Sequence, residues 1–475
     1  MEIHSAVKAF MSELNRRKLN LHSVLITQDG NTLYEEYRAP FDADTPHRMY
    51  SVSKSFVAVG IGCLIDEGKL SLDSRIADFF PDKLSRDIAP EMRGQTVREM
   101  LIMNTCIANY NWFKHDSADR VKSYLAARPT KPAGSLFHYD STGSFVLGAL
   151  IERLSGKKLI DYLKLKFLNE LGGFENAYFL AVPDGTAWGD SALLCTTRAL
   201  ERFARFVMNL GKWNGKQLVS RDFMLQATSF QSDTNLTGVS AYNSYGYGYQ
   251  IWLTEQGGYS FHGMGGQHAI VVPKDRLIFA VTGDNQYNAN YADTMYDAFF
   301  RCFYPAAETA SPAAIPTAEG RAYSPFEARI SGAKFVCREN PMGIKWFQLD
   351  FEGTGGTQVR SGCAFTYENA QGVKRIPFGM NKNDYGLFPQ LGYSDDRGCV
   401  HEINGFMYKC AASAAWQEER KLFIRVQIID RYFGSLHINI GFRDENSCAI
   451  YMVKAAEDFL DEYSGWAMAE RANRT

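Results

Sequence analysis

Residues 50–56 read Tyr-Ser-Val-Ser-Lys-Ser-Phe and run directly into the apolar segment VAVGIGCLIDEGKL of residues 57–70. The apolar run predicts a buried helix. Ser51 and Lys54 stand three positions apart at its beginning, so both side chains project from one face of the first turn. A hydroxyl group one helical turn from an amine is a nucleophile beside a possible base. Lys54 can act as a base only in its neutral form, which burial among apolar residues favours.

The Ser-x-x-Lys pattern alone is not specific. It occurs also at Ser5/Lys8, Ser155/Lys158 and Ser331/Lys334. An ordinary helix N-cap with a solvated lysine is therefore an open interpretation of Ser51 and Lys54 taken by themselves. The context of this copy is what distinguishes it, because an aromatic residue precedes it, apolar residues follow it, and a helix is expected to begin there.

Composition places the chain among ordinary globular proteins. It has 475 residues with 45% hydrophobic, 13% aromatic and 22% charged residues and a formal net charge of −2. This length is enough for two or more domains. A basic stripe with interleaved aromatic residues, which nucleic-acid binding needs, is lacking. We therefore expect a small-molecule or short-peptide substrate and no nucleic-acid partner, and we leave homo-oligomerisation open.

The beginning of the chain and its cysteines indicate a cytoplasmic protein. Residues 1–24 lack the long apolar core of a signal peptide, and no segment reaches the roughly 18 uninterrupted apolar residues of a membrane span. The nine cysteines are scattered and never in Cys-x-x-Cys spacing. Reduced thiols are expected, with no metal site and no cofactor.

Two domains are expected. Residues 1–306 alternate helical and strand patterns, beginning with an amphipathic helix and a hairpin around Asp29-Gly30 and ending with a helix over residues 291–304. Residues 307–325 are rich in Ala, Pro, Ser and Thr and are predicted to be a linker. Residues 326–460 carry short alternating strands typical of an antiparallel barrel or sandwich, and 461–475 are predicted to be a C-terminal tail that follows a helix.

Three stretches of the first domain form one candidate constellation. Besides residues 51–54 they are Tyr139-Asp140-Ser141, in a loop before a helix, and residues 262–267, His-Gly-Met-Gly-Gly-Gln, in a strand. The glycines of the third stretch would let a substrate backbone lie close. Asp140 is interpreted as a turn residue, because aspartate commonly bonds its own backbone there.

In this order the motifs resemble those of the penicillin-recognising serine hydrolases, which include class C β-lactamases, D-aminopeptidases, D,D-peptidases and β-lactamase-type esterases. That family carries Ser-x-x-Lys, then Tyr-x-Asn or Tyr-x-Ser, then Lys-Thr-Gly or a His-x-Gly variant. Residues 137–157 and 245–252 also resemble family sequences. The resemblance implies an α/β fold, a β-lactamase/transpeptidase-like mixed sheet flanked by helices with a helical subdomain. The region after it resembles a lipocalin-like antiparallel β-barrel.

The resemblance also implies roles for individual residues. Ser51 would attack a carbonyl to form an acyl-enzyme, with Lys54 and Tyr139 moving the protons. The backbone N–H of Ser51 and a backbone N–H near Gly265 would stabilise the oxyanion. The predicted substrate-binding residues are Ser141, His262, Gly263, Gly265 and, from the helical subdomain, Trp112.

The third motif departs from the family. His262 would replace the usual lysine, and Met264 stands where the His-x-Gly pattern has glycine. A histidine is mostly neutral near pH 7, so we expect weaker selection for substrate carboxylates. If His262 contacts the substrate, kcat/KM should show an ionisation between about pH 5 and 8. D-aminopeptidase-like or carboxylesterase-like activity is thus favoured. The alternatives are β-lactamase or D,D-peptidase activity, or a penicillin-binding-type sensor that does not turn over.

Overall fold

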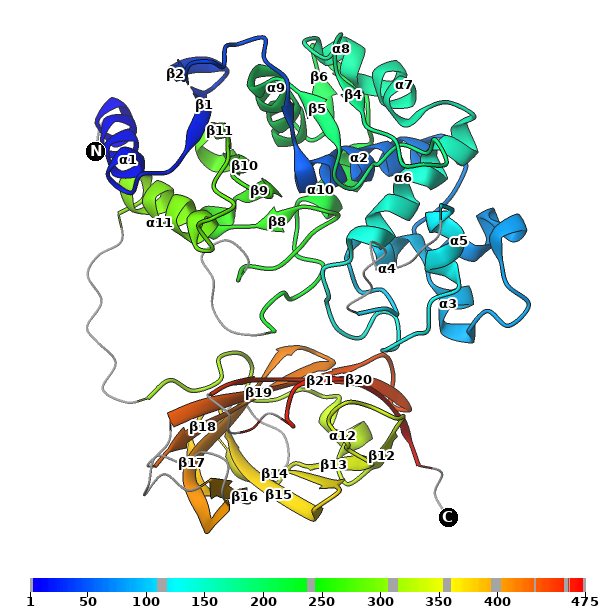
Figure 1. Cartoon of the computed structure of the whole chain (residues 1–475), viewed down its shortest axis with the longest axis vertical. Coiled ribbons are helices and arrows are strands. Elements are labelled where there is room, and N and C mark those ends of the chain that lie inside the picture. The colour runs from blue at the N-terminus through cyan, green and yellow to red at the C-terminus, as the bar shows by residue number, and fades with distance from the viewer. Residues whose placement is uncertain are drawn as a thin grey trace. The chain divides into compact units, whose positions relative to one another are not determined.

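The computed structural model describes residues 3–108, 118–236, 244–305, 315–352, 360–393, 403–430, 433–456, 460 and 462–472. Figure 1 shows the course of the chain. Backbone contacts divide it into two compact units. The first consists of Met1–Asn104, Asn109–Ala127 and His138–Thr309, and the second of Thr105–Ala108, Arg128–Phe137 and Ala310–Thr475. All predicted site residues that the structure describes belong to the first unit.

The first unit is built on one six-stranded sheet. Its strands lie in the order β2 (Asn31–Tyr37), β1 (Leu21–Gln28), β11 (Leu277–Gly283), β10 (Gln267–Val272), β9 (Tyr259–Gly263) and β8 (Trp252–Leu253). Each neighbouring pair is antiparallel. The predicted hairpin is confirmed, since Asp29 and Gly30 adopt φ values of 51° and 80° between β1 and β2, the left-handed conformation of a tight turn.

Helices cover both faces of this sheet. Helices α1 (Ile3–Arg16) and α11 (Tyr291–Phe303) lie on one face and α9 (Thr197–Met208) on the other (Figure 1). Because side chains alternate along a strand, Phe279 of β11 points toward α1, where its ring lies 4.9 Å from that of Phe10. Thr282 points to the opposite face, where the Ser23 hydroxyl joins it to Thr197 of α9.

The apolar run after residue 52 forms the buried helix that its composition predicts. Helix α2 (Ser53–Asp66) is buried at each position from Ser53 to Leu64. It packs against α6 (Ser141–Ser155), and its Phe56 ring stacks on Phe203 of α9 at 3.6 Å. The helix that begins beside Ser51 is therefore fixed on several sides by the core of the first unit.

The remaining elements of the first unit are short. They are β3 (His47–Arg48), η1 (Tyr50–Val52), η2 (Ile76–Phe79), η3 (Pro81–Lys83), α3 (Pro90–Gly94), α4 (Val97–Leu101), α5 (Arg120–Leu125), α7 (Leu159–Leu163), η5 (Lys164–Leu168), α8 (Asn169–Leu171), β4 (Tyr178–Phe179), β5 (Leu193–Cys195), β6 (Lys212–Trp213), β7 (Lys216–Gln217), α10 (Arg221–Ala227), η6 (Glu255–Gly257) and η7 (Pro273–Asp275). Helix α6 ends at Gly156, whose φ is 66°, before α7 begins.

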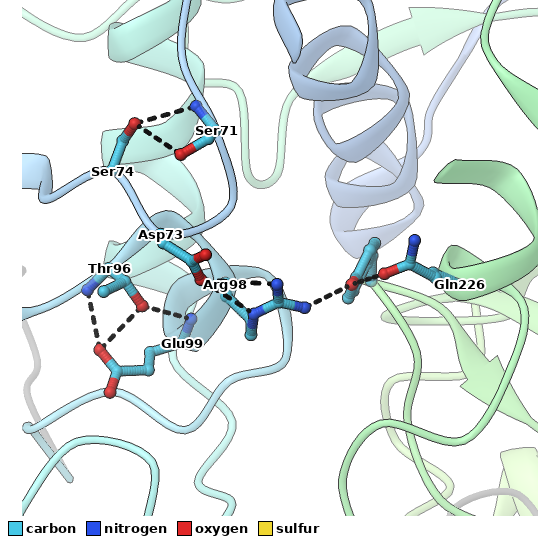
Figure 2. A network of polar contacts seen from close by, with 8 residues as sticks. Ser71, Asp73, Ser74, Thr96, Arg98, Glu99 and Gln226 are labelled. Atoms are coloured by element: carbon cyan, nitrogen blue, oxygen red, sulfur yellow. Dashed lines mark hydrogen bonds and ion pairs between the residues drawn. The ribbon is translucent and has the colours of Figure 1, made fainter. Parts of the chain in front are cut away.

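Polar contacts fix α4, as Figure 2 shows. Thr96 and Glu99 form a capping box at its beginning, which satisfies backbone N–H groups that the helix leaves free. Arg98 contacts Asp73 and donates to the phenol of Tyr249 at 3.2 Å. The Tyr249 hydroxyl in turn donates to Gln226 Oε1 of α10 at 2.9 Å. These bonds hold the segment around residue 249 against α4 and α10.

The second unit is a closed β-barrel. A ten-stranded sheet runs through β15 (Gly372–Met380), β14 (Arg360–Asn369), β13 (Trp346–Asp350), β12 (Lys334–Cys337), β21 (Gly465–Arg471), β20 (Ser447–Ala455), β19 (Phe433–Phe442), β18 (Lys421–Ile429), β17 (Ile403–Glu418) and β16 (Asp384–Tyr393). Parallel pairing of Gly379 with Ser413 and of Met380 with Ala414 joins β15 to β17 and closes it. The predicted fold class, an α/β unit followed by an antiparallel barrel, is confirmed.

Two predicted boundaries are wrong. The helix and tail expected near the C-terminus are replaced by β21, which pairs with β20 and β12. Its alanines favour a helix in isolation, but burial between two strands overrides that propensity. The predicted linker also belongs to the barrel from residue 315 onward, because Ala318 N–H donates to Ser413 Oγ at 2.8 Å and Arg321 pairs with Trp416. Helix α12 (Glu327–Ile330) follows it.

Among the helices that the structure describes, none has the length and apolar character needed to cross a bilayer.

Candidate active site

The chain makes a sharp turn immediately before the predicted nucleophile. Tyr50 has a φ of 45°, a left-handed conformation that costs free energy for a residue with a side chain. Ser51 follows in the turn η1, directly before α2. Strand β5 holds this turn in place, since Met49 N–H donates to Leu193 O at 2.8 Å and Leu193 N–H donates to Ser53 Oγ at 3.0 Å.

Gln250 holds α2 from the other side. Its backbone carbonyl accepts from Ser55 Oγ at 2.7 Å, and its Oε1 accepts from Ser144 Oγ of α6 at 2.6 Å. Its Nε2 donates to the carbonyls of Met100 and Leu101 in α4. Gln250 therefore joins α4 and α6 through its side-chain amide and α2 through its backbone carbonyl, which brings the beginning of α2 and the beginning of α6 into a fixed relation.

Ser51 and Lys54 are in direct contact. Lys54 Nζ donates to Ser51 Oγ at 3.0 Å and to the backbone carbonyl of Asp190 at 2.8 Å. The lysine side chain is 1% exposed, whereas Lys8, Lys158 and Lys334 of the other Ser-x-x-Lys copies are exposed. The N-cap of α2 is Val52, without a side-chain bond. The alternative of a helix cap with a solvated lysine is therefore wrong.

Tyr139 lies close to this pair. Asp140 caps α6, because its side chain accepts from Gly143 N–H at 2.9 Å, which confirms the turn role expected for it. The adjoining Tyr139 ring stacks on Trp252 at 5.5 Å. Lys54 Nζ lies 5.2 Å from the centroid of the Tyr139 ring, over its face. The structure thus brings Ser51, Lys54 and Tyr139 together from two helix starts. Ser141 is the first residue of α6 and is partly exposed.

His262 lies among other aromatic rings. It pairs in register with His268 of β10, and its ring centroid lies 4.3 Å from that of His268 and 6.4 Å from that of Tyr296 on α11. Burial lowers the pKa of His262 to about 3. Burial therefore favours the neutral histidine between pH 5 and 8, which argues against the ionisation expected from it in that range.

The glycines after His262 differ in their surroundings. A Cβ atom at Gly263 would lie 2.3 Å from the carbonyl oxygen of Met49, so only glycine lets β9 come this close to the turn that carries Ser51. Gly265 N–H donates to the Tyr291 hydroxyl at 2.9 Å, and that N–H is thus already occupied. The Met264 side chain between them is 47% exposed.

Asp190 is a site residue that the sequence reasoning missed. Its side chain is 3% exposed, and Oδ2 lies 3.8 Å from Lys54 Nζ. Burial raises the pKa of Asp190 to about 6, although the positive charges of Lys54 and Arg120 act against this. Its segment, Trp-Gly-Asp-Ser, carries no spacing that marks a site. Only the fold brings it to Lys54, so no sequence signal could have found it. Trp112 lies outside the described residues.

Ser51 accepts a hydrogen bond from a buried lysine at the start of an apolar helix, beside an antiparallel sheet with helices on both faces. This combination is typical of the penicillin-binding and β-lactamase-like serine hydrolase superfamily. The chain belongs to the Beta-lactamase family, whose model matches residues 6–298.

Similar proteins extend this result. The 6-aminohexanoate-dimer hydrolase of Paenarthrobacter ureafaciens is 27% identical over an alignment of 275 residues, and the match covers 53% of this chain and 69% of that protein. SurE, solved with D-Leu, has a TM-score of 0.54 at 15% identity and covers 98% of both chains. The octameric penicillin-binding protein homologue from Pyrococcus abyssi has a TM-score of 0.50 at 16% identity, covering 98% of this chain and 100% of its own. The chain is a hydrolase, and the fold likeness extends over both units.

Proposed function

We propose that the protein is a serine hydrolase that acts through an acyl-enzyme on small amides, peptides or esters, with Ser51 as the nucleophile. The observation that carries this proposal is the 3.0 Å contact between Lys54 Nζ and Ser51 Oγ in a site where the lysine is 1% exposed. The name of the Paenarthrobacter relative supports an amide substrate for that protein, and the shared family supports the same chemistry here.

In the proposed acylation step, Ser51 Oγ attacks the substrate carbonyl while its proton moves to the neutral amine of Lys54. The proton then passes to the leaving amine or alcohol. Tyr139, whose ring faces Lys54, is proposed to share this transfer and to help activate water for deacylation.

The oxyanion needs two N–H donors. The first proposed donor is the N–H of Ser51. For the second we propose Met264 in place of the N–H near Gly265, because Gly265 already donates to Tyr291. Met264 follows directly on Gly263, the residue that approaches the carbonyl of Met49. Together these two donors would stabilise the charge that develops on the carbonyl oxygen.

Substrate binding is proposed to use Ser141, Gly263 and Trp112, with His262 supporting the strand from behind. A neutral, buried His262 offers no fixed cation for a substrate carboxylate. D-aminopeptidase-like or carboxylesterase-like activity is accordingly favoured over β-lactamase or D,D-peptidase activity, which depends on a carboxylate of the substrate. A sensor that is acylated without turnover is the second candidate.

The test is incubation with a serine-directed phosphonate, followed by intact-protein mass spectrometry. Wild type should gain one adduct, Ser51→Ala should gain none, and Ser5→Ala should label like wild type. Ser5 is a matched control, because it belongs to an exposed Ser-x-x-Lys copy. Equal labelling of Ser51→Ala would refute the proposal. Steady release of nitrophenol from a short nitrophenyl ester would then separate an enzyme from a sensor, since a sensor gives a single stoichiometric burst.

A further inference from the structure

Asp190 contacts Lys54 in two ways. The residue lies between β4 and β5, its backbone carbonyl accepts from Lys54 Nζ at 2.8 Å, and its carboxylate Oδ2 lies 3.8 Å from the same nitrogen. Both side chains are almost fully buried, at 1% and 3% exposure. Lys54 is therefore placed between the hydroxyl of Ser51 and the carboxylate of Asp190.

The carboxylate of Asp190 is costly to bury in its charged form. Its Oδ1 atom is buried and has no hydrogen-bond partner in the described part of the chain, and an unsatisfied buried oxygen is destabilising. The charged groups that act on it are Lys54 and Arg120, which favour the carboxylate, and Asp140, which disfavours it. Burial outweighs the two cations and shifts the pKa of Asp190 upward, so the protonated acid is within reach near neutral pH.

Such a buried pair can exist in two forms that have the same net charge. One form is an ammonium with a carboxylate, and the other is an amine with a carboxylic acid. The two forms differ by the position of one proton, and desolvation favours the uncharged one. A lysine that must act as a base needs the second form.

We propose that Asp190 holds the proton of Lys54 during acylation, so that Lys54 meets Ser51 as a neutral amine. Lys54 Nζ and Asp190 Oδ2 first close from 3.8 Å to hydrogen-bonding distance. An N–H bond of the Lys54 ammonium then breaks and an O–H bond forms at Asp190 Oδ2, which leaves an amine and a carboxylic acid. The amine lone pair then accepts the Ser51 proton as Oγ bonds to the substrate carbonyl. Asp190 is in this scheme a positioning and proton-holding residue, and the inference rests on the proposed function.

The scheme predicts the pH dependence of Ser51 reactivity. Below about pH 6 Asp190 is protonated and can no longer take the proton of Lys54, so the rate falls on the acid side. In Asp190→Asn the proton of Lys54 can leave only to solvent. The acid limb should therefore move to higher pH, and the rate at pH 7 should fall by about 100-fold, the scale of a lost general base.

The experiment measures the second-order rate constant of Ser51 phosphonylation from pH 4 to 10, in wild type, Asp190→Asn and Glu201→Gln. Glu201 is the matched control, since it is a buried carboxyl group on α9 whose burial also raises its pKa, and it bonds Thr27 rather than the site. We expect Glu201→Gln to keep the acid limb of wild type. A slower Asp190→Asn with an unmoved acid limb would assign Asp190 a merely structural role and overturn the inference.

Two further outcomes separate this inference from the proposed function. If wild type is not labelled at Ser51, the proposed function fails and the inference falls with it. If wild type is labelled and Asp190→Asn has an unchanged profile, only the inference fails. Should Asp190→Asn not fold, Asp190→Glu decides the matter, because it keeps a carboxyl group. It should keep an acid limb at lower rate, and loss of that limb would overturn the inference.

Discussion

Replacing Gly263 with alanine is expected to slow acylation of Ser51 by about 100-fold. The added Cβ atom would lie 2.3 Å from the carbonyl oxygen of Met49, whereas ordinary contacts begin near 3.4 Å. The backbone must therefore give way by about 1.1 Å, the difference between these distances. Met49 stands two residues before Ser51, so the shift reaches the nucleophile. A misplacement of about 1 Å costs roughly 100-fold in rate, or about 2.7 kcal/mol of activation free energy.

The assay is the rate of Ser51 labelling by the phosphonate, with thermal unfolding measured in parallel, because overpacking costs about 1–3 kcal/mol of stability. Gly94→Ala is the matched control. A Cβ atom there meets nothing within 4 Å, and the residue does not need a left-handed conformation. The reasoning is refuted if a folded Gly263→Ala labels within threefold of wild type, since β9 would then not set the position of Ser51.

Three further predictions concern the surroundings of the site. His262 is neutral in the native protein because burial lowers its pKa from 6.5 to about 3. It therefore stabilises the fold above about pH 6.5, and this contribution is lost as the pH falls toward 3. His262→Gln should reduce the loss of stability between pH 6.5 and 4 by about 3 kcal/mol, as measured by urea unfolding at both values, and leave the pH profile of labelling unchanged. The same loss of unfolding free energy as in wild type between these two pH values, or a shift in the pH profile of labelling, would contradict this. Asp140→Ala removes the cap of α6 and should cost about 1 kcal/mol; equal urea midpoints would argue against the cap. Gln250→Leu removes the side-chain hydrogen bonds to α4 and α6, and should lower stability by at least about 2 kcal/mol together with the labelling rate; unchanged unfolding would show that this amide does not hold the two helices.

The sequence was sufficient for most of the fold. The three-residue spacing of Ser51 and Lys54, followed by apolar residues, predicted a buried helix carrying both, and α2 is that helix. The hairpin at Asp29-Gly30 and the barrel strands were readable from local turn and alternation patterns, because these depend on neighbours in the chain. The helix expected near the C-terminus failed, since β21 owes its conformation to strands β12 and β20 rather than to its own residues.

The candidate site also contains residues that the sequence could predict and residues that it could not. Ser51, Lys54 and Tyr139 belong to motifs with local signatures, and the structure brings them together. Asp190 has no such signature, because its contact with Lys54 spans 136 positions of the chain. The environment of His262 could not be predicted from the sequence either, since the rings around it come from β10 and α11. Local sequence can name a nucleophile, but burial and charge around it follow from tertiary packing.

The most direct test of the central claim is to trap the acyl-enzyme. The protein is mixed with a short nitrophenyl ester, quenched in acid within the burst, digested and mapped by mass spectrometry. We expect the acyl group on Ser51, and we expect Ser51→Ala to give neither adduct nor burst. An acyl group on any other residue, or a full burst from folded Ser51→Ala, would contradict the central claim.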